Sequence, residues 1–160
     1  MGDAMPPSDG RHPDEPAFHE LLGARLLEQS EGRARYELTV GETHLNRRGV
    51  AHGGVAASLL DSALGTAVVT SIKKEEWCGT LELSVQFREA IRPGRITAEG
   101  RMARRGRTAA FAEGEIRDAA GKILATAQQM ARMVTLAGGG QLAWPALLRK
   151  LDRTNPGYAD

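Results

Sequence analysis

In this 160-residue sequence, two adjacent glycines and one acid along a single apolar segment are candidates for a reactive site. Gly53 and Gly54 follow His52, and Asp61 lies within the apolar stretch that comes next. From Val55 onward the apolar residues recur at helical spacing for about 17 residues. The spacing predicts a helix that begins near the glycines and carries a carboxylate in its middle.

The glycines would lie where a helix exposes backbone donors. The first N–H groups of an α-helix have no partner within the helix and lie at the positive end of its dipole. Glycine at Gly53 and Gly54 lets another group approach that backbone closely. Such N–H groups can stabilise an oxygen that becomes negative during a reaction, and one donor is worth about 3 kcal/mol in the transition state. The alternative is that the two glycines only make a tight turn from loop to helix.

A carboxylate within an apolar helix is costly unless it is paired, hydrated or used in a reaction. The residues four positions before and after Asp61 are Ala57 and Gly65, which are small and leave room for another molecule. Asp61 is therefore a candidate functional carboxylate with room beside it for another molecule. The alternative is a structural acid that bonds a neighbouring strand or faces solvent at an uncovered edge.

The separation of these groups predicts an oligomer. Gly53 and Asp61 are eight positions apart, which is about 12 Å along a helix that rises 1.5 Å per residue. A carbonyl oxygen and the group that attacks its carbon must lie within a few ångströms of each other. If both residues act on one carbonyl, Asp61 must come from a second subunit whose helix runs antiparallel. We therefore expect a two-fold dimer with two equivalent sites.

The segments that must position this helix alternate between apolar and polar residues, as half-buried strands do. Five segments follow the pattern: residues 33–40, 80–88, 95–103, 108–117 and 122–134. Residues 18–30 are expected to form a short helix that leads into a strand, and short turns are expected at 93–94, 104–107 and 118–121. The order of one strand, the helix and then four strands in a meander predicts an α+β fold in which a five- to six-stranded antiparallel sheet wraps around the helix. One helix cannot cover both faces of such a sheet, which again favours a dimer.

Composition and length limit the classes of function and the domain organisation. Charged residues make up 26% of the chain and the net charge is +1, which argues against a protein that coats nucleic acid. No apolar run approaches the roughly 20 residues of a membrane helix, and the N-terminus does not resemble a signal peptide. The single cysteine, Cys78, is expected to be a small buried apolar residue in a reducing, cytoplasmic setting. Residues 1–18, with four prolines, are expected to be a flexible tail, 19–136 the domain, and 137–160 a C-terminal extension that could form a short helix.

The motif around the glycines resembles a known family. The matching pattern is Asn46-x-x-Gly49-x-x-His52-Gly53-Gly54, then Asp61, then Thr80-x-Glu82-Leu83. It resembles hotdog-fold acyl-CoA thioesterases, most closely the phenylacetate-degradation (PaaI-like) branch, over roughly residues 20–135. The resemblance implies a long helix wrapped by an antiparallel sheet, homodimers that often pair into homotetramers, and hydrolysis of acyl-CoA or aryl-CoA thioesters to free acid and coenzyme A.

The resemblance also implies a role for each matching residue. The Gly53 N–H would polarise the thioester carbonyl, and Asp61 of the partner subunit would act as general base or nucleophile. Asn46 would lie near the water or the thioester, and Thr80 would help to hold the water. His52 would orient the loop or bond near the thioester.

A basic turn is the candidate site for the nucleotide end of coenzyme A in this resemblance. It comprises Arg104, Arg105, Gly106, Arg107 and Thr108. Guanidinium groups and turn N–H groups suit phosphates; the alternative is a solvated basic hairpin. No metal and no separate cofactor are expected, because coenzyme A enters as part of the substrate.

Two other functions remain open. One is an enoyl-thioester hydratase or dehydratase, which usually needs a His–acid pair for proton transfer at carbon; the helix contributes only Asp61, which favours hydrolysis. The other is a non-catalytic acyl-CoA-binding module, since a fold does not determine a function. No nucleic-acid or membrane partner is expected.

Overall fold

The computed structural model describes residues 17–73 and 76–135. Its elements in chain order are α1 (Ala17–Leu22), β1 (Ala24–Ser30), β2 (Arg33–Val40), the 3-10 helix η1 (Glu42–His44), α2 (Gly53–Val69), β3 (Glu76–Phe87), β4 (Gly94–Arg105), β5 (Ala109–Asp118) and β6 (Ile123–Thr135). The predicted tail up to residue 16 and the predicted C-terminal extension over 137–160 lie outside the described residues. No helix in the described part of the chain is long and apolar enough to cross a bilayer.

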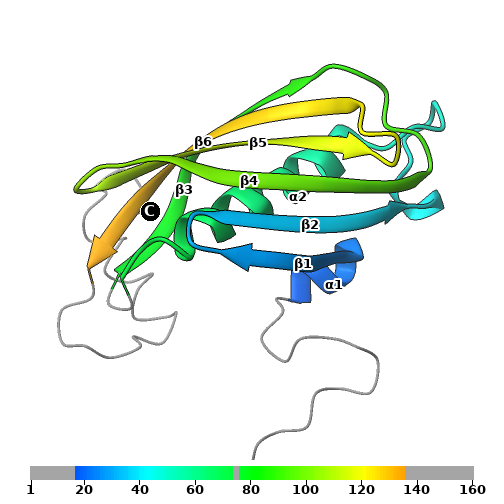
Figure 1. Ribbon diagram of the computed structural model, residues 1–160. Helices are drawn as coiled ribbons and strands as arrows, with labels where there is room; N and C mark the ends of the chain where they lie inside the picture. The colour runs from blue at the N-terminus through cyan, green and yellow to red at the C-terminus, as the bar shows by residue number, and fades with distance from the viewer. Residues whose placement is uncertain (1–16, 74–75, 136–160) are drawn as a thin grey trace, which may run out of the picture.

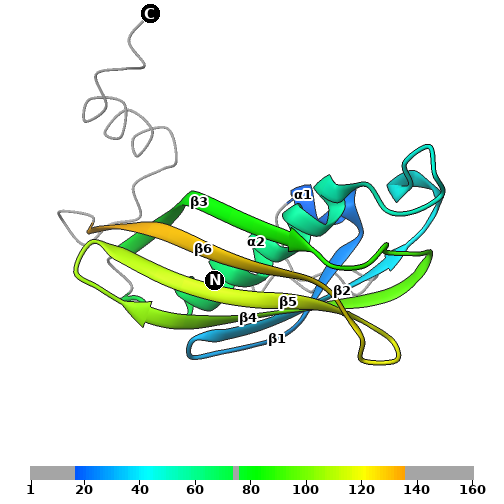
Figure 2. The ribbon, with the colours of Figure 1, turned by 90° about the horizontal axis from the view of Figure 1, so that it is seen from above.

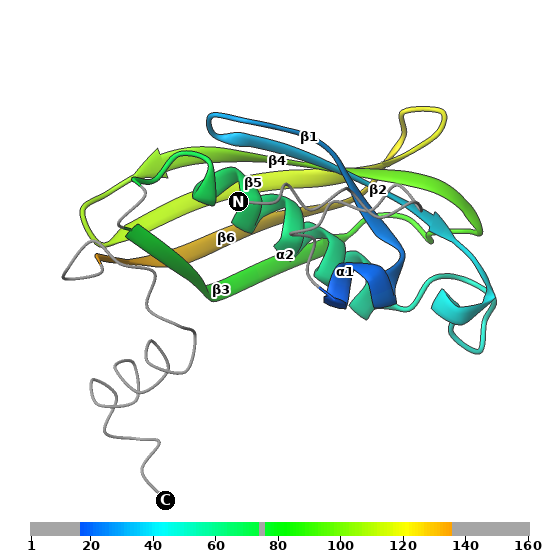
Figure 3. The ribbon, with the colours of Figure 1, turned by 90° about the horizontal axis from the view of Figure 1, so that it is seen from below.

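One antiparallel six-stranded sheet curves around the central helix α2, which confirms the predicted α+β fold (Figure 1). The sheet covers α2 when it is seen from one side (Figure 2), and α2 lies across the open face of the sheet when it is seen from the other (Figure 3). α1 lies beside α2, where His19 Nε2 and Ser62 Oγ are 2.9 Å apart. α1 is followed by Gly23, whose φ of +71° is a conformation that glycine adopts without strain.

The strand order differs from the predicted four-strand meander. The order is β1-β2-β4-β5-β6-β3, so β4, β5 and β6 are sequential neighbours, but β3 pairs with β6 and β4 pairs with β2. The prediction is wrong for β3 because α2, about 25 Å long at 1.5 Å per residue, carries the chain from β2 to the opposite edge of the sheet. Alternation along a strand shows which face is buried, and it carries no information on which strand lies alongside.

Small residues let α2 approach the sheet closely. One row across four strands on the helix side consists of Ala34, Gly100, Gly114 and Ala127. A Cβ atom at Gly100 would overlap the carbonyl oxygen of Ala63 in α2. The largest fully buried side chains fill the space around this row: Leu38, Leu59, Leu60, Leu64, Val68, Ile96 and Ile116. This packing sets the depth at which the residues of α2 meet β3 and β6.

Candidate active site

The carboxylate of Asp61 is held by side chains from two strands. It lies in the middle of α2, where one of its oxygens, Oδ1, accepts two hydrogen bonds. Thr80 Oγ1 of β3 donates one over 2.9 Å, and Gln129 Nε2 of β6 donates the other over 2.8 Å. Gln129 Nε2 also lies 3.0 Å from Thr80 Oγ1 and donates to it. The three side chains therefore form a closed triangle in which each member contacts the other two.

The local structure of β3 and β6 directs Thr80 and Gln129 toward α2. The pairing of β3 with β6 shifts between Thr80, which lies opposite the buried Ala131, and Glu82, which lies opposite Met130. Such a bulge inserts one residue and re-aims the side chains beside it. Alternation along β6 places Gln129 on the same buried face as Ala131. Thr80 and Gln129 are therefore directed toward α2 and meet Asp61 there.

The second oxygen of Asp61 stays available. Within residues 17–73 and 76–135, Oδ2 accepts no hydrogen bond, and Asp61 is half-buried rather than sealed. A Cβ atom added to Gly65, one helical turn away, would meet nothing within 4 Å. The small neighbours that were predicted to leave room around the carboxylate therefore do so on the Gly65 side.

The charge of Asp61 affects a neighbouring thiol. Cys78 precedes Thr80 by two positions on β3 and is partly buried. Burial, and secondly the negative charge of Asp61, raise the pKa of the Cys78 thiol. Because the thiolate is the reactive form of cysteine, a raised pKa makes Cys78 a poor nucleophile near neutral pH.

At the start of α2, acceptors of His52 bind two of the first backbone N–H groups but not that of Gly53. His52 is the N-cap, and its Nδ1 accepts a hydrogen bond of 2.9 Å from the Gly54 N–H. The His52 carbonyl oxygen accepts from the Val55 N–H over 2.9 Å. The Gly53 N–H has no acceptor among the described residues. Gly53 is thus the first residue of the helix and carries the unpaired donor that an oxyanion site requires.

Gly53 lines a shallow hollow of about 470 Å³. Its walls include the Phe87 ring at the end of β3 and the segment that follows, up to the buried Ile91. A Cβ atom on Gly53 would lie 3.3 Å from Phe87 Cζ, so a side chain there would press on the ring. Glycine keeps the approach to the backbone open, as expected from the sequence.

Asn46 shapes the loop that leads into α2. Its Oδ1 accepts a 2.8 Å hydrogen bond from the Arg48 N–H, and its own N–H donates to the Val50 carbonyl over 2.8 Å. Gly49, with φ of +75°, donates to the Asn46 carbonyl over 3.0 Å and closes the turn. In this structure Asn46 therefore fixes the loop, and Arg48 is exposed at its tip.

The predicted catalytic residues fall into two separate groups within one chain. Asn46, His52 and Gly53 lie at the N-terminal end of α2, whereas Asp61 lies two helical turns further along, where Thr80 of β3 bonds it. α2 is continuous from Gly53 to Val69, so the predicted separation of about 12 Å applies. A single chain does not bring the donor and the carboxylate to the same atom.

The basic turn between β4 and β5 is partly occupied by internal contacts. Arg105 Nη2 lies 2.6 Å from Glu76 Oε2 of β3, and the Arg104 guanidinium stacks over the Phe111 ring at 4.7 Å. Gly106 donates to the Ala109 carbonyl over 2.8 Å and closes the hairpin. Arg107 is exposed and makes no ion pair with a described residue. Thr108, also exposed, lies beside it.

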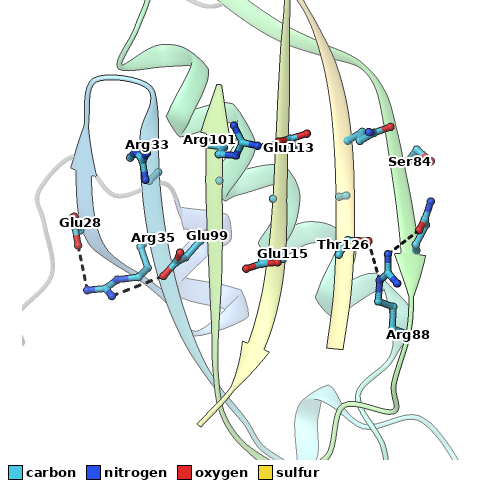
Figure 4. A pocket seen from close by; sticks show the side chains of 16 residues that line it. Glu28, Arg33, Arg35, Ser84, Arg88, Glu99, Arg101, Glu113, Glu115 and Thr126 are labelled. Atoms are coloured by element: carbon cyan, nitrogen blue, oxygen red, sulfur yellow. Dashed lines mark hydrogen bonds and ion pairs between the residues drawn. The ribbon is translucent and has the colours of Figure 1, made fainter. Parts of the chain in front are cut away.

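A second hollow, of about 640 Å³, lies on the opposite face of the sheet (Figure 4). Its floor carries alternating acids and arginines that neutralise one another. Arg35 Nη2 lies 3.1 Å from Glu28 Oε2, and Arg101 pairs with Glu113. None of the predicted site residues lines this hollow, and it is remote from Asp61 because the sheet lies between them.

Gln129 is a residue of this site that was not predicted from the sequence. The sequence pattern could have identified it. The alternating inward positions from Ile123 to Met133 are apolar except for Gln129. Only the pairing of β6 beside β3 places that side chain next to Asp61. No group of three or more His, Cys, Asp or Glu residues that could hold a metal ion is found among the described residues.

The chain is similar to several known proteins. A family model, the thioesterase superfamily, matches residues 48–125. A protein of Archaeoglobus fulgidus named "Putative esterase" is 34% identical over 110 residues, which are 68% of this chain and 70% of that protein. The solved structure of a "phenylacetic acid degradation-related protein" from Ralstonia eutropha has a TM-score of 0.70 and 26% identity, over 78% of this chain and 94% of its own. The E. coli PaaI protein, from the phenylacetic acid degradation operon, has a TM-score of 0.71 and 22% identity, over 78% of this chain and 90% of its own.

Proposed function

Because this chain belongs to the thioesterase superfamily and has the hotdog fold of the PaaI-like thioesterases, we propose that it hydrolyses acyl-CoA or aryl-CoA thioesters to a free acid and coenzyme A. Hydrolysis of thioesters in general is the chemistry that the family supports. The coenzyme A ester, the residues that act on it and the shared site are our proposal.

The observation that carries this proposal is the hydrogen bonding of the Asp61 carboxylate. Thr80 and Gln129 hold one carboxylate oxygen, and the other has no partner among the described residues. Oδ2 removes a proton from water as the water oxygen attacks the thioester carbon. Alternatively, Oδ2 attacks that carbon itself, and water then hydrolyses the resulting anhydride.

The negative charge that develops on the carbonyl oxygen needs a donor. The unpaired Gly53 N–H at the positive end of α2 supplies it, and one such donor is worth about 3 kcal/mol in the transition state. The C–S bond then breaks, and coenzyme A leaves as a thiolate that takes up the proton held by Asp61. Free acid and thiol are the products, and no redox step is involved.

The separation of Gly53 and Asp61 requires two subunits, and β3 supports a place where they meet. β3 is a 12-residue edge strand that pairs with β6 on one side and with no other described strand. Leu81 and Phe87 on it are 59% and 58% exposed. A long, apolar, unpaired edge is a template for another strand. We infer that two copies of β3 pair antiparallel across a two-fold axis, which would bring two α2 helices side by side.

The opposite edge of the sheet is a poorer candidate for this contact. β1 has seven residues, its pairing with β2 is interrupted between Leu26 and Glu28, and it carries the charged Arg25 and Glu28. Short strands, bulges and charges are the features that protect sheet edges from pairing.

For the nucleotide end of coenzyme A we retain the basic turn, with Arg107 and Thr108 as its most available members. Arg105 is already paired with Glu76, and Arg104 lies over Phe111. An exposed guanidinium with no internal ion pair can bind a phosphate without breaking an existing contact.

The direct test is thiol release from a panel of acyl-CoA and aryl-CoA esters. Wild-type protein should release thiol from at least one ester, and Asp61→Asn and Asp61→Ala should reduce kcat by about 100-fold or more. The matched control is Glu31→Gln, which removes an exposed carboxylate in the turn between β1 and β2. This variant should retain activity. Turnover that both Asp61 variants retain would remove Asp61 from the mechanism.

The same panel separates the alternatives. Tight binding of a CoA ester without thiol release would favour a binding module, and hydration of an enoyl-CoA without thiol release would favour a hydratase. Neither alternative has a specific contact in its favour, since the side chains that bond Asp61 are those of Thr80 and Gln129 and neither is a histidine.

Mixing of subunits tests the shared site. Gly53→Pro removes the N–H at the first helical position, where the backbone tolerates proline and the Phe87 ring must yield slightly to the new side chain. Asp61→Ala removes the carboxylate. Each variant alone should be inactive, whereas a mixture should recover part of the activity, because a mixed dimer rebuilds one intact site. Lack of recovery despite demonstrated subunit exchange would contradict the shared site.

A further inference from the structure

Gln129 is the most buried polar side chain near the candidate site. It is 2% exposed and lies on β6, between β3 and β5 in the sheet. Its neighbours on the same face of β6, Ala127 and Ala131, are small and buried. A side chain in such surroundings has little freedom to turn, so its contacts are fixed by the sheet.

The amide group of Gln129 is oriented by what it donates to. Nε2 donates to Asp61 Oδ1 over 2.8 Å and to Thr80 Oγ1 over 3.0 Å. The amide oxygen, Oε1, is buried and has no hydrogen-bond partner among the described residues. Rotating the amide by half a turn would set Oε1 against the carboxylate oxygen, and two acceptors cannot bond each other.

An unpartnered buried carbonyl is unfavourable, and native proteins rarely keep one without a reason. Here the alternative orientation would lose the hydrogen bond to the Asp61 carboxylate, which can only accept. The side chain therefore keeps its hydrogen bond to the Asp61 carboxylate, although its own carbonyl oxygen is left without a partner among the described residues. Polar groups that are kept in spite of their own burial are typical of functional sites.

We propose that Gln129 is a positioning residue for Asp61: it anchors Oδ1 and the Thr80 hydroxyl so that Oδ2 alone faces the substrate. This inference rests on the proposed thioester hydrolysis. Gln129 does not touch the reacting atoms and acts through Asp61. A carboxylate with both oxygens free to rotate would spend less time in the reactive geometry, and small displacements of a reacting group are costly in rate.

The test uses Gln129→Met, which keeps the length and volume of the side chain and removes both donors. We expect kcat to fall about 10- to 100-fold while KM for the same CoA ester stays within about twofold. We also expect the unfolding temperature to stay the same or rise, because the unpartnered carbonyl is removed with the donors. A residue with a purely structural role would instead lower the unfolding temperature and leave kcat unchanged.

The matched control is Gln128→Met. Gln128 is the preceding residue and lies on the exposed face of β6. It lines the hollow of about 640 Å³ on the side of the sheet that faces away from α2. It should change neither kcat nor KM. Gln129→Asn, which keeps the amide on a shorter side chain, should recover part of the loss seen with Gln129→Met, since it can still donate at a longer distance.

A measurement that does not depend on activity keeps this inference separate from the proposed function. In a ¹H–¹⁵N spectrum, the side-chain NH₂ signals of Gln129, identified by their loss in Gln129→Met, should shift and exchange faster in Asp61→Asn, whereas those of Gln128 should not. If these signals respond but no CoA ester is hydrolysed, the positioning contact stands and the proposed substrate is wrong. Unchanged Gln129 signals in Asp61→Asn, or full kcat in a folded Gln129→Met protein, would overturn the inference.

Discussion

At the scale of single residues, Asp61 influences more than the reaction proposed for it. Its charge acts on Cys78, whose thiol pKa is raised first by burial and second by this carboxylate. Since the pKa is higher in the folded than in the unfolded chain, the associated stability is present below the ordinary thiol pKa. It is lost as the pH rises from there through the raised value. The reactivity of the Cys78 thiol can therefore report on the charge of the Asp61 carboxylate.

We predict that Asp61→Asn makes Cys78 more reactive. Removing the negative charge lowers the pKa of the thiol, so more thiolate is present at a given alkaline pH. Alkylation by iodoacetamide, followed by mass spectrometry over about pH 7 to 10, should be faster in Asp61→Asn than in wild type, with the midpoint moved to lower pH. Glu31→Gln should behave as wild type. Superimposable profiles for Asp61→Asn and wild type would show that the carboxylate is not charged near Cys78.

At the scale of elements, the beginning of α2 explains what His52 does. Its Nδ1 accepts from the Gly54 N–H, as an N-cap side chain should, whereas the Gly53 N–H has no acceptor among the described residues. This contact supports the expectation that His52 orients the loop. The alternative, in which its ring bonds near the thioester, would have to use Nε2.

Substitutions at His52 separate these two roles. Asparagine places an acceptor where Nδ1 lies and is among the best N-cap residues. His52→Asn should therefore keep the stability and most of kcat, whereas His52→Ala should lose about 1 kcal/mol of unfolding free energy and part of the activity. Thermal unfolding and initial rates measure both. An inactive but fully stable His52→Asn protein would indicate a chemical role for the imidazole ring.

The close approach of α2 to the sheet gives a second prediction. A methyl group on Gly100 would overlap the Ala63 carbonyl oxygen, so Gly100→Ala must push the helix outward. We expect a loss of about 1–3 kcal/mol in unfolding free energy, measured by urea denaturation. Gly41→Ala, where an added Cβ atom meets nothing within 4 Å, should change it by less than about 0.5 kcal/mol. Equal midpoints for Gly100→Ala and wild type would mean that α2 does not lie this close.

At the scale of the whole molecule, the contacts of β3 suggest a register for the proposed dimer. Phe87 packs near Gly53, and Thr80 bonds Asp61 within the same chain. If the two-fold axis passes beside Ser84, Phe87 of one subunit lies opposite the bulge that includes Thr80 of the partner subunit. Paired residues then share a face of the sheet, as antiparallel pairing requires. This register brings the Gly53 N–H of one subunit toward Asp61 of the partner subunit.

We predict that Ser84→Cys, made together with Cys78→Ser, forms a disulfide-linked dimer on mild oxidation, since two copies of this residue would face each other. In Gln86→Cys the two thiols would lie about 13 Å apart, four residues along the strands at 3.3 Å each, beyond the reach of a disulfide. Non-reducing electrophoresis compares the two variants. Cross-linking of Gln86→Cys in preference to Ser84→Cys would place the axis elsewhere.

Local patterns in the sequence were sufficient to predict the elements. The helical spacing from Val55 and the alternation over 33–40, 95–103 and 122–134 correspond to α2, β2, β4 and β6, because burial of one face acts on each segment separately. The order of the predicted helix and strands along the chain then predicted a sheet wrapped around one helix. The motif residues Gly53 and Asp61 were likewise visible, since an acid among apolar residues and glycines at a helix start are local features.

Only the tertiary structure decided which segments lie together. It placed β3 beside β6 rather than β4, and so brought Gln129 to an acid 68 positions earlier in the chain. It also showed that Arg105 is already paired with Glu76, although the sequence presents it as an available cation. Pairing between distant strands depends on the path of α2 across the sheet and on how closely small residues let it pack. Neither property is encoded in the periodicity of any one segment.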